Sequence, residues 1–124
     1  MAKRILLIND EQGDRNSAKA YFESFGGWEV MTSRSGYEGM GKAESTQPDA
    51  ILLDVRDLKT DGMGMLNQLQ ANPSTQAIPV LLLTTAFHTQ LCAQFAQRGV
   101  RGLTYTPYEP ATLATDVAES LGWA

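Results

Sequence analysis

Short apolar runs that end in polar residues recur along this chain. The runs lie at 4–8 (R-I-L-L-I), 28–32 (W-E-V-M-T), 50–53 (A-I-L-L), 79–83 (P-V-L-L-L) and 100–105 (V-R-G-L-T-Y). Apolar runs of this length, bounded by turn residues, are typical of strands buried inside a parallel sheet. The run at 28–32 is the most polar, so we expect it to lie at an edge of the sheet.

Apolar residues at helical spacing separate these runs. They predict helices over 14–25, 36–43, 63–71 and 89–98, and a last helix that opens at Glu109-Pro110 and ends at Gly122. The helix over 36–43 has the weakest support, because it contains three glycines and each costs about 1 kcal/mol relative to alanine in a helix interior. The spacing of Tyr37, Met40 and Ala43 still gives it one apolar face.

Alternating strands and helices predict an α/β fold, a flavodoxin-like doubly wound parallel sheet of five strands with five helices. The polar second strand favours the order 2-1-3-4-5. A chain of 124 residues is expected to form one domain over 1–124, with no output domain. In this order the topological switch lies between strands one and three, where ligands bind at the carboxyl ends. Asp10 and Asp54 both follow strands that end at this crevice.

Composition and charge exclude several classes of protein. The formal charge is −4, and a net negative surface repels a phosphate backbone, so we expect no nucleic-acid partner. The apolar runs are too short for a transmembrane span or a signal peptide, so no membrane association is expected. The lone cysteine, Cys92, has no internal disulfide partner, which fits a cytoplasmic location.

The crevice offers carboxylates and carbonyls, which are the ligands that Mg²⁺ prefers. One interpretation is a divalent cation held by Asp10, Asp54 and a backbone carbonyl of the following loop, that of Arg56. The other is a pair of solvated acids at loop starts, which are common in α/β folds, and spacing alone does not decide between them. A phosphate-binding first loop is disfavoured, because Asn9-Asp10-Glu11 replaces the Gly, Ser or Thr that such loops use.

Four blocks of sequence carry a resemblance to a known family. They are I-L-L-I-N-D-E, L-L-D-V-R-D-L-K-T-D-G, P-V-L-L-L-T-T and G-L-T-Y-T-P-Y, in this order and spread over the whole chain. Together they resemble the response-regulator receiver domain of bacterial two-component signalling, particularly the stand-alone receivers of cyanobacteria. The resemblance implies that Asp54 accepts a phosphoryl group from a histidine kinase or phosphotransfer protein and becomes an aspartyl phosphate. It further implies that Asp10 is a direct Mg²⁺ ligand and that the hydroxyl of Thr84 contacts the phosphoryl group.

The chain departs from the family pattern at several positions. Asn9 stands in place of the first acid of the family's pair; it can still accept a hydrogen bond from a metal-bound water, but metal affinity should fall. Thr106 replaces the family's lysine and supplies no cation. Leu58 replaces a proline, and Leu103 stands where an aromatic switch residue is often found. Arg56 is either a partial substitute for the lysine charge or a solvated loop arginine.

The leading functional hypothesis is a receiver that is phosphorylated on Asp54. It would signal to a downstream protein through the face built from helix four, strand five and helix five, and a homodimer is a further option. Its only chemistry would be self-phosphorylation and autodephosphorylation, so it is not expected to be an enzyme. The alternative is a pseudo-receiver, an interaction module that acts independently of phosphorylation. A metal-dependent phosphatase is a weaker third reading, because no positioned general base is visible.

Overall fold

Five parallel strands form the central sheet of the protein. The computed structural model describes residues 3–9, 19–20, 22–34, 37–54, 62–85, 93–94, 97, 100, 102–106 and 110–123. The strands are β1 (Arg4–Ile8), β2 (Glu29–Ser33), β3 (Ala50–Asp54), β4 (Val80–Thr85) and β5 (Gly102–Thr106). Their order is β2-β1-β3-β4-β5, so the predicted fold class and strand order are confirmed.

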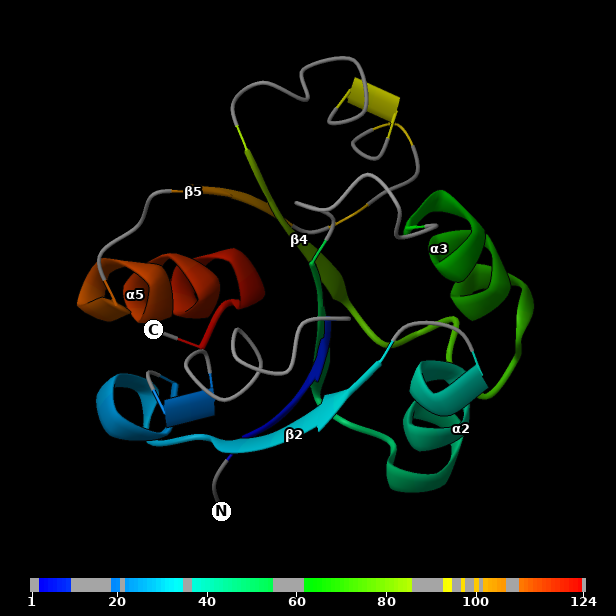
Figure 1. The fold of residues 1–124 in the computed structure, drawn as a ribbon, viewed down its shortest axis with the longest axis horizontal. Helices are drawn as coiled ribbons and strands as arrows, with labels where there is room; N and C mark the ends of the chain where they lie inside the picture. Colours follow the sequence, from blue (N-terminus) through cyan, green and yellow to red (C-terminus); the bar gives the residue numbers. More distant parts are fainter. Residues whose placement is uncertain are drawn as a thin grey trace.

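Helices cover both faces of this sheet (Figure 1). The π-helix η1 (Phe22–Gly26) and α5 (Pro110–Leu121) lie on one side, and α2 (Tyr37–Thr46) and α3 (Gly62–Ala71) lie on the other. Of the helix predicted over 14–25, residues 19–20 are helical and 22–25 belong to η1, a π-helix, whereas 14–18 and 21 lie outside the described residues. Most of the predicted helix at 89–98 also lies outside them, although residues 93, 94 and 97 are helical. None of the helices in the described part of the chain is long and apolar enough to cross a bilayer.

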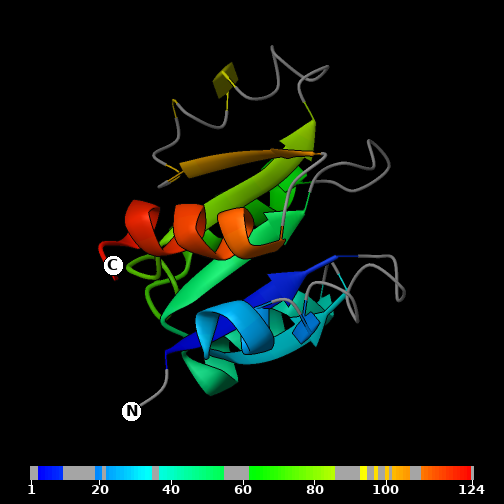
Figure 2. The same ribbon diagram turned by 90° about the vertical axis from the view of Figure 1, so that its left-hand side faces the viewer.

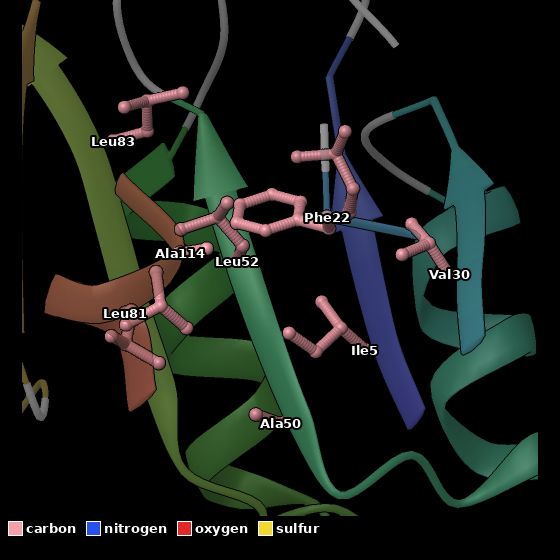
Figure 3. Close-up of a cluster of buried hydrophobic side chains, with 10 residues drawn as sticks. Ile5, Phe22, Val30, Ala50, Leu52, Leu81, Leu83 and Ala114 are labelled. Atoms are coloured by element: carbon pink, nitrogen blue, oxygen red, sulfur yellow. The ribbon is translucent and has the colours of Figure 1, made fainter. Parts of the chain in front are cut away.

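Side chains of β1, β3 and β4 alternate between two buried clusters, as the pleat of a strand requires. The first cluster lies beneath η1 and α5 and is shown in Figure 3; it contains Ile5, Leu7, Phe22, Val30, Ala50, Leu52, Leu81, Leu83, Ala114 and Val117. The second lies beneath α2 and α3 and contains Leu6, Ile8, Ala43, Ile51, Leu53, Met65, Leu66, Leu69, Val80 and Leu82. Every residue of β3 is buried, including its last residue, Asp54.

Several element boundaries differ from the prediction. The prediction ended the fourth strand at Leu83 and treated Thr84-Thr85 as its polar exit, but β4 continues through Thr85. The reason is pairing with β5, where Thr84 is opposite Tyr105 and Thr85 is opposite Thr106. Backbone hydrogen bonding at the sheet edge therefore overrides the change from apolar to polar side chains. The second strand also starts and ends one residue later than predicted.

Helix α2 approaches the sheet closely through Gly39. A Cβ added at this residue would lie 3.1 Å from the carbonyl oxygen of Arg34, 3.1 Å from Cδ1 of Ile8 and 3.2 Å from Cε of Met65. Gly41, two residues further along, has nothing within 4 Å of the corresponding position. Only the first glycine is therefore required by packing. The helix runs to Thr46, three residues beyond the prediction.

Aromatic rings close the edge of the sheet at which the strands begin. The ring of Trp28 lies 5.6 Å from that of Phe22 and 5.3 Å from that of Trp123, measured between centroids. Trp123 is held there by the end of α5, where its backbone N–H donates to the carbonyl of Ala118 at 2.8 Å and Gly122 adopts a φ of 74°. Figure 2 shows both chain ends at this side of the molecule, away from the carboxyl ends of the strands.

Candidate functional site

Asp54 is the last residue of the central strand β3. Its side chain is buried, with 5% of its surface exposed. The strand is fixed on both sides, because Leu53 is paired with Ile8 of β1 and Asp54 with Leu83 of β4. A carboxylate buried to this extent requires hydrogen-bond partners to offset the loss of water. The structure thus places one acid in a buried position at the carboxyl edge of the sheet.

Asn9 supplies one such partner. It follows β1, and its backbone N–H donates to the carbonyl of Ser33 in β2 at 3.0 Å, which extends the ladder one step past the strand. Its side-chain Nδ2 donates to Oδ2 of Asp54 at 2.5 Å, and Asn9 is also only 5% exposed. The expectation that the ends of strands one and three meet at one crevice is confirmed for these two residues.

The sequence did not reveal this direct contact. The sequence indicated only that Asn9 can accept a hydrogen bond from a metal-bound water. The strand order indicated only that the first and third strands are adjacent; the contact follows from their register, in which Asn9 and Asp54 each stand one residue past the pair Ile8 and Leu53. Side chains that follow one pairing row on adjacent parallel strands come within hydrogen-bonding reach.

Backbone register locates the two threonines of the predicted site. Asp54, Leu83 and Thr104 form one row across β3, β4 and β5. Thr84 stands one residue beyond this row on β4, and Thr106 stands two residues beyond it on β5. At about 3.3 Å per residue both lie at the carboxyl edge that carries Asp54. The threonine of β4 is on the strand next to Asp54, whereas Thr106 is one strand further away.

The remaining residues predicted for the site lie outside the described residues. They are Asp10 and Arg56, together with Leu58. Leu103 lies in β5, where it is paired with Leu82. Of the face predicted to meet a downstream protein, the structure describes the backbone of β5, helix α5 and residues 93, 94 and 97 of the helix predicted at 89–98.

The described donors fit a hard cation. Asp54 contributes a carboxylate and Asn9 an amide oxygen, and Mg²⁺ prefers such oxygen ligands. Within the described ranges no group of three or more His, Cys, Asp or Glu side chains is close enough to hold a metal. The other predicted ligands, Asp10 and the carbonyl of Arg56, lie outside those ranges.

A pocket of about 230 Å³ lies elsewhere in the molecule. It is lined by α3 residues such as Leu69 and by the segment from Thr75 to Val80, which leads into the start of β4. Asp54 is at the opposite end of these parallel strands. The pocket is therefore separate from the crevice between β1 and β3.

Comparison with known families identifies the chain. A model of the response regulator receiver domain matches residues 5–118. The chain belongs to the response regulator receiver family. Asp54 and Asn9 therefore occupy the switch-point crevice of a receiver domain, a module of two-component signalling.

Curated relatives are longer than this receiver domain. A protein-glutamate methylesterase/protein-glutamine glutaminase 3 from Rhodospirillum rubrum is 33% identical over 86 residues, which cover 69% of this chain and 22% of that protein. The response regulator Rre1 from Synechocystis is 27% identical over 117 residues, which cover 94% of this chain and 51% of that protein. The chain thus spans about half or less of the length of these relatives.

Solved structures share the fold of this receiver domain. A putative response regulator from Chloroflexus aurantiacus superposes with a TM-score of 0.87 at 23% identity and covers 98% of this chain and 99% of that chain. The receiver domain of the sensor histidine kinase PA1611 from Pseudomonas aeruginosa, which has a magnesium ion in its active site cleft, superposes with a TM-score of 0.83 at 24% identity. It covers 98% of this chain and 99% of that chain.

Proposed function

We propose that Asp54 accepts a phosphoryl group from a histidine kinase or phosphotransfer protein and that the phosphorylated receiver signals through contacts with other proteins. The observation that carries this proposal is the position of Asp54. It is a buried carboxylate at the end of the central strand, beside the topological switch of a receiver fold. A carboxylate placed there can reach a donor at the sheet edge while its strand remains fixed.

The transfer needs little covalent machinery. An oxygen of the Asp54 carboxylate attacks the phosphorus of a phosphohistidine in line with the leaving nitrogen. The new O–P bond forms as the P–N bond breaks, and the imidazole nitrogen keeps the electron pair and takes a proton from water. The rate then depends on how Asp54 is held and on how negative charge on the phosphoryl oxygens is balanced.

Mg²⁺ is the cofactor proposed for this site. The carboxylate of Asp54 would hold it together with Asp10 and the backbone carbonyl of Arg56, while Asn9 would act through a bound water. When bound, the cation balances charge on the phosphoryl oxygens. The magnesium ion in the active site cleft of the Pseudomonas receiver domain supports this assignment by analogy.

Thr84, Thr106 and Arg56 are assigned supporting roles. The hydroxyl of Thr84 would donate to the phosphoryl group, since its strand is adjacent to that of Asp54. Thr106 would offer a neutral hydrogen bond where the family has a lysine, and a neutral bond is about half as strong as a charge-assisted one. The guanidinium of Arg56 would then supply the missing positive charge.

Intact-mass spectrometry tests the proposal. The protein is incubated with Mg²⁺ and acetyl phosphate, alongside Asp54→Asn and a matched control, Asp116→Asn, whose carboxylate is exposed on α5. We expect a gain of one phosphoryl mass in the wild type and in Asp116→Asn, and no gain in Asp54→Asn. A wild type that gains no mass would refute the proposal and favour a pseudo-receiver.

The downstream partner is proposed to bind the face formed by the helix predicted at 89–98, β5 and α5. A homodimer through the same face is an alternative use of it. Sedimentation of the protein before and after phosphorylation separates the two uses. A mass that doubles on phosphorylation supports the homodimer, and a mass that stays at that of the monomer refutes a homodimer formed on phosphorylation.

A further inference from the structure

The hydrogen bond between Asn9 and Asp54 changes how the nucleophile is held. Nδ2 of Asn9 lies 2.5 Å from Oδ2 of Asp54, and each residue is only 5% exposed. Hydrogen bonds to ionised acceptors are roughly twice as strong as neutral ones, and exclusion of water strengthens them further. One oxygen of the carboxylate is therefore engaged by a side chain of the protein itself.

An acid at the position of Asn9 would create the opposite situation. Two carboxylates at this separation repel each other unless a cation lies between them. The amide of asparagine has nearly the same shape, but it presents an N–H donor to Asp54. The N–H donor partly stabilises the negative charge at Oδ2, as a cation would, but it adds no net charge of its own.

We propose that Asn9 is a positioning residue that holds Asp54 in the cation-free protein and competes with a divalent cation for Oδ2 of Asp54. A cation that takes the lone pair of Oδ2 used by the amide has to displace the amide N–H, after which the amide oxygen can accept a hydrogen bond from a cation-bound water. We call the hydrogen bond from Asn9 to Asp54 the clamp, and its use in signalling rests on the proposed phosphoryl transfer. The clamp itself does not.

Competition has a measurable consequence for cation affinity. Because the cation has to displace the hydrogen bond from Asn9 to the charged carboxylate, the wild type should bind Mg²⁺ roughly tenfold more weakly than a protein without this bond. Asn9→Ala removes the competing donor and also the amide oxygen that would accept from a cation-bound water; because the lost donor acts on the charged carboxylate itself, Asn9→Ala should still bind Mg²⁺ more tightly than the wild type, by up to about tenfold. Asn9→Asp removes the donor and adds a charge, so it should bind more tightly still.

Nuclear magnetic resonance of ¹⁵N-labelled protein reads the clamp directly. The side-chain NH₂ signals of Asn9 are assigned through its backbone and compared with those of Asn67, which is exposed on α3. In the presence of a chelator, one Asn9 proton should resonate downfield of the Asn67 pair because it donates to a carboxylate. On titration with Mg²⁺ that signal should move toward the Asn67 position, while the Asn67 pair stays in place.

Calorimetric titration with Mg²⁺ gives the second measurement, with Asn67→Ala as the matched control that should keep wild-type affinity. An Asn9→Ala protein that binds Mg²⁺ no more tightly than the wild type would overturn the competition. So would an Asn9 signal that Mg²⁺ leaves unchanged at saturation. If Asn9→Ala does not fold, the wild-type amide signal still decides, because it reads the hydrogen bond without any substitution.

Failure of this inference is distinguishable from failure of the proposed function. A shifted Asn9 signal that responds to Mg²⁺, combined with no phosphoryl gain in the mass spectrum, supports the clamp and refutes phosphoryl transfer. A phosphoryl gain combined with an Asn9 signal like that of Asn67 supports phosphoryl transfer and refutes the clamp.

Discussion

Two glycines of α2 offer a matched test of the packing behind the site. Helix propensity alone predicts that Gly39→Ala and Gly41→Ala each raise the free energy of unfolding by about 1 kcal/mol. Gly41 is exposed, and an added Cβ there meets nothing within 4 Å, so Gly41→Ala should deliver this gain. Gly39 is buried between β1 and α3, so the two substitutions should differ.

The geometry at Gly39 sets the size of that difference. The added Cβ would lie 3.1 Å from the backbone oxygen of Arg34, which cannot move without shifting the chain that leads into α2. It would also lie 3.1 Å from Cδ1 of Ile8 and 3.2 Å from Cε of Met65, two flexible side-chain ends. Overpacking of a core costs about 1–3 kcal/mol, which exceeds or cancels the propensity gain. We therefore expect Gly39→Ala to be less stable than Gly41→Ala by about 1–3 kcal/mol.

Urea denaturation followed by far-ultraviolet circular dichroism measures both variants. In thermal denaturation of the same variants, a difference of 1 kcal/mol in the free energy of unfolding corresponds to a shift in melting temperature of roughly 4 °C for a domain of this size. The slope of the free energy against urea should stay at its wild-type value, because neither change alters the surface exposed on unfolding. If Gly39→Ala proves as stabilising as Gly41→Ala, the close approach of α2 to β1 is wrong.

Other substitutions probe the core, the aromatic edge and the site. Thr75 is 1% exposed and its Oγ1 donates to the carbonyl of Leu69 at 2.7 Å, so Thr75→Val should lower the free energy of unfolding by about 1–2 kcal/mol in urea titrations while Thr75→Ser retains most of it. Trp123→Ala removes the edge-on contact with Trp28 and should cost about 1–2 kcal/mol, with a smaller loss for Trp123→Phe; equal losses would contradict a ring contact. Arg56→Ala should slow phosphorylation by acetyl phosphate in time-resolved mass spectra, and a wild-type rate would remove the idea that Arg56 substitutes for the family's lysine.

The fold could be predicted from the sequence because burial on both faces makes parallel strands continuous apolar runs. The run at 50–53 gave β3, and the polar run at 28–32 gave the edge strand β2. Boundaries were less predictable where they depend on a neighbouring strand. The extension of β4 to Thr85 comes from backbone pairing with β5, and the pattern of apolar residues does not indicate this extension.

The position of the site could be predicted from the sequence, but the hydrogen bond between its residues could not. Strand order placed the ends of β1 and β3 at one crevice, and the structure brings Asn9 and Asp54 together there. The choice between a bond through water and a direct bond depends on strand register, which a single sequence does not specify. The roles of Asp10 and Arg56 stay predictions.

Both tryptophans of the chain, Trp28 and Trp123, stand in contact with each other at the edge where the strands begin. Asp54 stands at the far end of five-residue strands, about 17 Å further along the strand direction at the usual rise per residue. Indole emission responds to the immediate surroundings of the ring, so the intrinsic fluorescence of this receiver reports whether α5 and β2 remain docked. This fluorescence should not change when a cation or a phosphodonor binds at Asp54. The molecule thus carries an optical probe of its own unfolding that can be read while a ligand is bound at Asp54.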